Sequence, residues 1–96
     1  MSDPSYTVEV TATAEHEWNR LSESEREEVR TWLQQLARTP LPGGRSGVIR
    51  LRGRVADVHP LFYAQTKHFG IFHIVVEQRV FVLLILELPQ LDVTSA

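Results

Sequence analysis

The residues from 69 to 88 constrain the fold of this 96-residue chain more than any other stretch. Ile71–Val76 and Arg79–Glu87 are runs of β-branched, aromatic and leucine residues, separated by the polar pair Glu77-Gln78. Short apolar runs broken by a polar pair predict two adjacent strands of an antiparallel hairpin. Alternate side chains of a strand point to opposite faces, and here both faces are largely apolar. One face therefore lies on the core, and the other is covered by something else or binds a partner.

The residues before this hairpin predict a strand and two helices. Tyr6–Val10 alternates apolar and polar side chains, which is typical of a half-buried strand. A short helix is expected next, because apolar residues recur at helical spacing up to Leu21. Ser22 and Glu25 have the spacing of a capping box, which opens a second helix. That helix should end near Thr39, because a proline follows and disfavours helix in the residue before it.

Two more strands are expected between the helices and the main hairpin. Val48–Arg52 alternates arginine with apolar residues, Gly53 interrupts it, and a further strand should lie around Val58–Tyr63. The predicted fold is therefore α+β: a strand, a two-helix hairpin, then a three- to four-stranded antiparallel sheet with the helices on one face. We expect residues 1–96 to form one domain, with flexible tails at 1–5 and 89–96.

Charge is divided unevenly along the chain. Residues 1–37 hold eight acids and three arginines, a net charge of −5, whereas residues 38–79 hold seven basic residues and two acids, a net +5. This asymmetry favours an anionic partner for the second segment, although a solvated surface gives the same pattern. The chain has no cysteine, which excludes disulfides and zinc–thiolate sites. Its longest apolar run is too short to span a bilayer, and we expect a cytoplasmic protein with no membrane partner.

Three arginines are the clearest candidates for binding a ligand. Arg50, Arg52 and Arg54 alternate along one predicted strand and would point to the same side if the strand continues past Gly53. The planar guanidinium group can hold a phosphate through two hydrogen bonds. The row is therefore a candidate phosphate-binding track, or else an exposed strand that carries charge only for solubility.

Three histidines lie in the same half of the chain as these arginines. His59, His68 and His73 could transfer protons near neutral pH, although a lone histidine in a strand is more often structural. His73 would lie on the open side of the sheet if its face also carried Phe81, Leu83 and Ile85. No metal or other cofactor is expected, because no histidine pair has the i,i+4 spacing of a helical metal site.

These segments, in this order, resemble the RelE/ParE superfamily of bacterial toxins over about residues 6 to 87. Arg50–Gly53 is similar to the basic–Leu–basic–Gly segment that precedes the central strands of that family. Gly70–Val75 is similar to its Gly–x–aromatic–Arg–aliphatic strand, with His73 where arginine is usual. The superfamily comprises the toxin halves of type II toxin–antitoxin modules, so the resemblance implies a cognate antitoxin as partner.

RelE-like members cut messenger RNA on the ribosome without a metal, by attack of a ribose 2′-hydroxyl on the adjacent phosphate. That reaction needs a base, an acid and cations that stabilise the developing charge. By this resemblance Arg50 and Arg52 would stabilise charge, and the histidines would be the acid and base. The implied catalytic candidates are Arg50, Arg52, His59, His68 and His73, and the further RNA-binding candidates are Arg45, Arg54 and Lys67.

Two alternatives remain open within the resemblance. ParE-like members inhibit DNA gyrase by binding alone, and a non-toxic member would serve as a module for dimerisation or antitoxin binding. Three features depart from the nuclease pattern: an isoelectric point near 6.0, His73 in place of arginine, and a segment after Leu88 without basic or tyrosine residues. A homodimer and a toxin–antitoxin hetero-oligomer are both compatible with the sequence.

Overall fold

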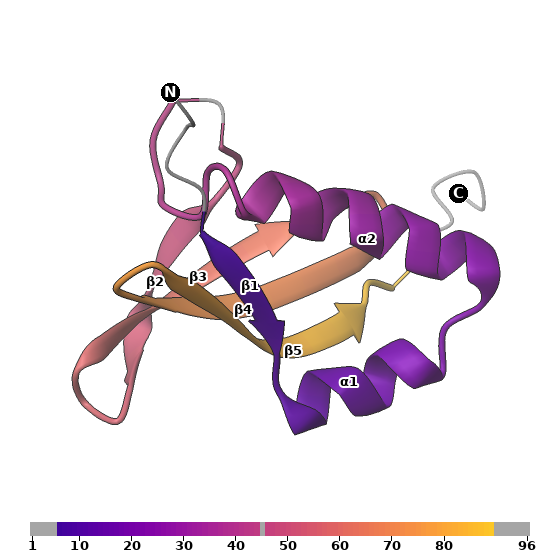
Figure 1. Cartoon of the computed structure of the whole chain (residues 1–96), viewed down its shortest axis with the longest axis horizontal. Helices are drawn as coiled ribbons and strands as arrows, with labels where there is room; N and C mark the ends of the chain where they lie inside the picture. Colours follow the sequence, from indigo (N-terminus) through magenta and orange to yellow (C-terminus); the bar gives the residue numbers. More distant parts are fainter. Residues whose placement is uncertain (1–5, 45, 90–96) are drawn as a thin grey trace, which may run out of the picture.

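The structure is a computed structural model that describes residues 6–44 and 46–89. The expected tails at 1–5 and 89–96 lie outside the described residues except for Pro89, and Arg45 also lies outside them. Two helices and five strands follow one another along the chain (Figure 1). They are β1 (Thr7–Val10), α1 (Ala12–Asn19), α2 (Glu23–Leu36), β2 (Ile49–Val55), β3 (His59–Gln65), β4 (Phe69–Val76) and β5 (Arg79–Glu87).

All five strands form one sheet in the order β1-β5-β4-β3-β2. The four strands after the helices pair antiparallel, whereas β1 runs parallel to β5, so the sheet is mixed. The predicted α+β order of a strand, two helices and an antiparallel sheet is confirmed. None of the helices in the described part of the chain is long and apolar enough to cross a membrane.

The predicted capping box opens α2. The N–H of Glu25 donates to Ser22 Oγ at 3.3 Å, and the N–H of Ser22 donates to Glu25 Oε1 at 2.7 Å. The bond from the Ser22 N–H is the main reason that the pKa of Glu25 is lowered. The helix ends at Leu36, three residues before Thr39, and its last turn tightens: the N–H of Arg38 donates to the carbonyl of Gln35, three residues back, at 3.0 Å.

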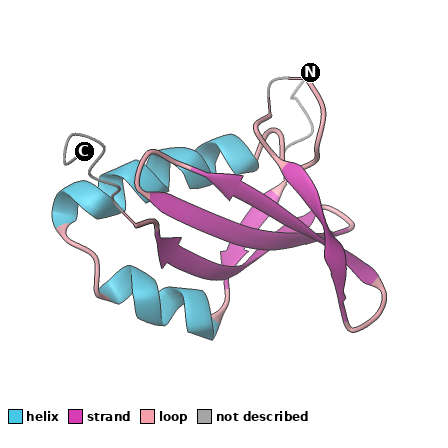
Figure 2. Ribbon diagram, turned by 180° about the vertical axis from the view of Figure 1, so that it is seen from behind, coloured by secondary structure: helices cyan, strands magenta, loops and turns pink. Residues whose placement is uncertain are grey.

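The core lies between the helices and one face of the sheet. Figure 2 shows the strands from the other face, which α2 does not cover. Alternate residues of β4 and β5 point toward the helices, with Ile71 opposite Ile85 and His73 opposite Val82. The fully or almost fully buried apolar residues of this core are Ala14, Val29, Leu36, Val48, Phe62, Ala64, Phe69, Ile71, Val82 and Ile85.

Candidate functional site

Strands β2 and β3 form a hairpin that carries the arginine row. Arg50, Arg52 and Arg54 are all exposed on β2, the last strand on its side of the sheet. The pairing with β3 is irregular, because three residues of β2 between Arg50 and Arg54 lie opposite one residue of β3. Such a bulge twists the strand locally and leaves backbone groups without a ladder partner. The arginines therefore line an exposed and irregular edge.

The turn at the end of this hairpin is strained. Ala56 and Asp57 both have positive φ, 56° and 57°, and the N–H of Val58 closes the turn on the carbonyl of Val55 at 3.2 Å. A non-glycine residue in this conformation costs about 1 kcal/mol. Val58 is 68% exposed at the same tip. The tip of the hairpin thus carries a strained turn and an exposed apolar side chain, and the three arginines lie along the strand that leads to it.

His59 begins β3 and is the histidine nearest to the arginines along the hairpin. It lies opposite Val55, while the next residue, Pro60, lies opposite Arg54. Residues opposite one another share a face of the sheet, and neighbours in a strand point to opposite faces. His59 and Arg54 therefore belong to the same hairpin but project from opposite faces of it.

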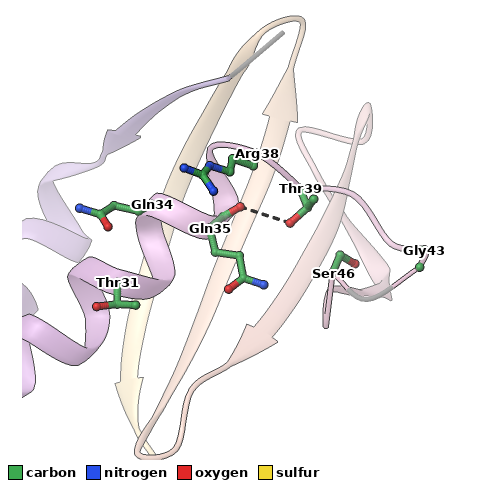
Figure 3. Close-up of a pocket in the computed structure, with 8 residues that line it drawn as sticks. Thr31, Gln34, Gln35, Arg38, Thr39, Gly43 and Ser46 are labelled. Carbon is green, nitrogen blue, oxygen red and sulfur yellow. Dashed lines mark hydrogen bonds between the residues drawn. The ribbon is translucent and has the colours of Figure 1, made fainter. Parts of the chain in front are cut away.

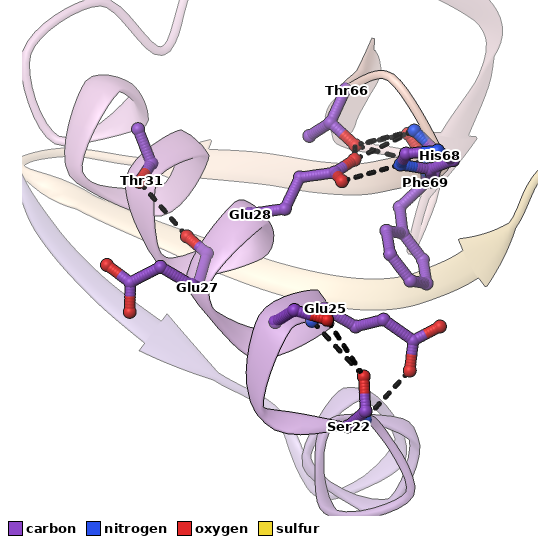
Figure 4. Close-up of polar contacts among 9 residues, drawn as sticks. Ser22, Glu25, Glu27, Glu28, Thr31, Thr66, His68 and Phe69 are labelled. Carbon is purple, nitrogen blue, oxygen red and sulfur yellow. Dashed lines mark hydrogen bonds and ion pairs between the residues drawn. The ribbon is translucent and has the colours of Figure 1, made fainter.

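His68 lies in the turn between β3 and β4, at the other end of β3. Its Nδ1 is 2.7 Å from Glu28 Oε1, and its backbone N–H donates to Glu28 Oε2 at 2.8 Å (Figure 4). The hydroxyl of Thr66 donates to the same carboxylate. Burial favours the neutral carboxyl of Glu28, but the hydrogen bonds from Thr66 and His68 outweigh it and lower the pKa. Glu28 thus fastens the β3–β4 turn to α2.

This turn lies at the end of β3 that is away from the hairpin tip. Seven residues of β3 separate the two ends of the strand, a length of about 20 Å. Arg54 lies opposite Pro60 near the tip, and Arg50 lies opposite Phe62, three residues before the end of the strand. Lys67, which is exposed, lies in the same turn as His68. The structure therefore places His68 and Lys67 with the acids of α2 and not with Arg50, Arg52 and Arg54.

His73 is fully buried, so the expectation that it lies on the open side of the sheet is wrong. Its side chain is 0% exposed, its Nε2–H donates to the carbonyl of Pro40 at 2.8 Å, and its ring packs 5.6 Å from that of Phe62. A register shift between Phe72 and His73 places His73 opposite Val82 and not beside Phe81. Burial lowers the pKa of His73, and the bond to Pro40 offsets only part of that effect.

The opposite side of the sheet carries apolar side chains, which we call the outer face: Tyr63, Phe72, Ile74, Phe81, Leu84 and Leu86. Leu86 is 44% exposed, Ile74 is buried, and the other four are half-buried. Phe72 lies opposite both Tyr63 and Leu84, and it alternates with the buried Ile71 and His73. The rings of Tyr63 and Phe72 are 4.8 Å apart. At the edge of the outer face, Leu84 and Leu86 line a hollow of about 440 Å³ together with residues of α1.

Tyr63 was not identified from the sequence. Its ring lies against the backbone of Gly70, and a Cβ added there would come 2.6 Å from Tyr63 Oη. The pairing of Gln65 with Gly70 and of Tyr63 with Phe72 brings these residues together. The sequence signal for this contact is the spacing of seven positions between Tyr63 and Gly70. That spacing predicts a contact only once the register of β3 against β4 is known.

A second hollow, of about 610 Å³, lies where α2 ends. Figure 3 shows side chains of α2 on one side of it and residues of the following segment on the other. Thr39 Oγ1 donates to the carbonyl of Gln35 at 3.2 Å within this region. The residues that line the hollow are Thr31, Gln34, Gln35, Arg38, Thr39, Gly43, Gly44 and Ser46.

The arrangement suits anion binding better than acid–base catalysis. The three arginines share one exposed edge, whereas the histidines are dispersed: His59 projects from the other face, His68 is tied to Glu28, and His73 is buried. Among residues 6–44 and 46–89, no three side chains of the metal-binding types come together as a possible metal site.

Comparison with solved structures identifies the fold. The chain is similar to an archaeal RelE in its RelE–RelB complex from Pyrococcus horikoshii, with a TM-score of 0.69 and 17% identity over 85% of this chain and 93% of that one. It is also similar to the isolated E. coli RelE toxin, with a TM-score of 0.58 and 18% identity over 94% and 92% of the two chains. No family model and no curated sequence matches it. The chain therefore has the fold of the RelE toxins.

Proposed function

We propose that this chain is the toxin of a type II toxin–antitoxin module and that it acts on messenger RNA at the ribosome. The observation that carries this proposal is the row of exposed arginines on β2, in a chain with the fold of the RelE toxins. Guanidinium groups spaced along one strand match the repeated phosphates of an RNA backbone. Arg50, Arg52 and Arg54 would hold the RNA.

The cleavage reaction needs stabilisation of negative charge more than any other single contribution. As the ribose 2′-hydroxyl attacks the neighbouring phosphate, negative charge develops on the phosphate oxygens. In our proposal Arg50 and Arg52 lie against these oxygens and hold the two reacting groups in line. His68 and His73 are held elsewhere, and His59 projects from the face opposite Arg54, so we assign charge stabilisation to this chain and proton transfer to none of these three histidines.

A second candidate is a toxin that inhibits a protein such as DNA gyrase by binding alone. The separation of the histidines from the arginine row favours it, because binding needs no acid or base. The outer face also favours it, since neighbouring apolar side chains that stay partly open to solvent are typical of protein interaction sites. Under both candidates we propose that the outer face binds the cognate antitoxin or, in its absence, a second copy of the chain.

RNA binding by the purified protein tests the first candidate. We would measure the affinity for a short single-stranded RNA at several salt concentrations. Alanine at Arg50, Arg52 and Arg54 together should weaken binding and reduce the slope of log affinity against log salt by about two, because each lost phosphate contact removes about 0.7. Arg20→Ala is the matched control, since Arg20 is exposed at the end of α1. The proposal would be contradicted if Arg20→Ala lowered the RNA affinity as much as the triple substitution does, or if the unsubstituted protein did not bind RNA.

A further inference from the structure

We propose that the hollow at the end of α2 is a binding site for a nucleotide. It is lined by residues of α2 and of the segment after it, at Thr31, Gln34, Gln35, Arg38, Thr39, Gly43, Gly44 and Ser46. Its volume of about 610 Å³ lies within the range of small-molecule sites. The nucleotide would be either free in solution or one residue of a bound RNA.

The charge of the lining selects an anionic ligand. Among the described residues of the lining, Arg38 is the one that carries a charge, and it makes no ion pair with any residue that the structure describes. Four further hollows formed by the described residues each include at least one glutamate, which would repel a phosphate. The described lining of this hollow has no carboxylate, so among these five hollows it is the one where a phosphate would meet a cation without a competing acid.

The uncharged groups of the lining match the rest of a nucleotide. Gln34 and Gln35 each carry an amide that both donates and accepts, as the edge of a base requires. Thr31 Oγ1 already donates to the carbonyl of Glu27 at 3.0 Å, so it can accept a hydrogen bond from a ribose hydroxyl or a base N–H. A site built only for inorganic phosphate would need cations and N–H donors but not these amides.

The end of a helix is ordinarily unfavourable for an anion, because its carbonyl oxygens carry partial negative charge. Here the carbonyl of Gln35 is already engaged by the N–H groups of Arg38 and Thr39, at 3.0 and 2.9 Å, and by the Thr39 hydroxyl. The opposing backbone charge is therefore reduced beside Arg38. Gly43 and Gly44, on the other wall, have positive φ and carry no side chain to fill the hollow.

Trp32 provides a reporter for this site. A Cβ on Gly47 would come 3.2 Å from the Trp32 ring, so the indole packs directly behind the segment that forms one wall of the hollow. The chain has two tryptophans, and Trp18→Phe leaves Trp32 as the one fluorescent indole. A ligand that orders this wall should change the emission of Trp32.

The experiment is a titration of the Trp18→Phe protein with adenosine monophosphate, inorganic phosphate and adenosine. We expect saturable binding of the nucleotide and at least tenfold weaker binding of phosphate and of adenosine. Arg38→Gln should weaken nucleotide binding about tenfold or more, and Arg20→Gln should leave it unchanged. No saturable change at about 10 mM nucleotide, or equal effects of the two substitutions, would overturn the proposal. Calorimetry with the unsubstituted protein repeats the measurement without the reporter.

The source of the nucleotide follows from competition with a single-stranded RNA. If RNA displaces adenosine monophosphate, the hollow holds a residue of the RNA, and the inference then rests on the proposed function. If both bind together, the ligand is a free nucleotide. Neither titration depends on toxicity, so a host that grows normally would count against the toxin and not against this site.

Discussion

The Nε2–H of His73 donates to the carbonyl oxygen of Pro40 at 2.8 Å, and this bond joins the middle of β4 to the segment that follows α2. A carbonyl can only accept, so the proton of the neutral ring lies on Nε2. Nδ1 is buried and has no partner among the described residues. A histidine held in this way stabilises the fold and cannot reach a substrate.

The burial of His73 predicts a loss of stability in mild acid. Its pKa is lowered from the ordinary value of 6.5 in the folded state, so below pH 6.5 the unfolded chain binds a proton that the folded protein does not. The free energy of unfolding should fall by up to about 1.4 kcal/mol per pH unit below 6.5, until the folded-state pKa is reached. Urea unfolding at a series of pH values measures this.

Two histidine substitutions serve as controls for that pH dependence. His73→Phe should remove the fall in stability that begins below pH 6.5, although it lowers stability at every pH by leaving the Pro40 carbonyl unpaired. His16→Phe, at an exposed position of α1, should retain the fall. An unchanged profile in His73→Phe would show that another group titrates.

Glu28→Gln should destabilise the protein by about 1–3 kcal/mol, because the carboxylate accepts hydrogen bonds from Thr66 and His68 that a neutral amide replaces poorly. The pKa of Glu28 is lowered from 4.5, so its contribution is present above pH 4.5 and is lost as the pH falls through the folded value. Thermal unfolding at neutral and acid pH measures both effects. Glu27→Gln, on the exposed side of α2, should lower the stability much less. Similar losses of stability in the two variants would count against the Glu28 contacts.

Gly70→Ala should destabilise the sheet by about 1–3 kcal/mol, because the new methyl group would lie 2.6 Å from Tyr63 Oη and 2.8 Å from the nearest ring carbon. Gly53→Ala is the matched control, since the nearest atom to its Cβ is Leu61 Cδ2 at 3.8 Å. Urea unfolding compares the two variants. If Gly70→Ala were no less stable than Gly53→Ala, Tyr63 would not pack on Gly70 as the structure has it.

Much of the fold could be predicted from local patterns. The Ser22–Glu25 capping box and the runs on either side of Glu77-Gln78 each depend on residues close in sequence, and each lies where the sequence indicated. The parallel pairing of β1 with β5 was not predicted, because it joins residues about 70 positions apart and leaves no local signal.

The candidate site was harder to predict for the same reason. The alternation of arginine with other residues was enough to predict the arginine row on one strand, and all three arginines are exposed on β2. The neighbours of His73 depend on one irregularity, the register shift of one residue between Phe72 and His73 in the pairing of β4 with β5. A one-residue shift moves a side chain to the other face, and no composition rule indicates where such a shift falls.

The most direct test of messenger RNA cleavage is the induction of this chain alone in a bacterial host, followed by mapping of messenger RNA ends. We expect growth arrest with new ends inside translated codons. Arg50→Ala with Arg52→Ala should restore growth and remove the cuts, whereas Arg20→Ala should not. Growth arrest with intact messages would contradict the RNA claim and favour a gyrase-type target, and normal growth of the host with the unsubstituted chain would contradict the toxin assignment itself.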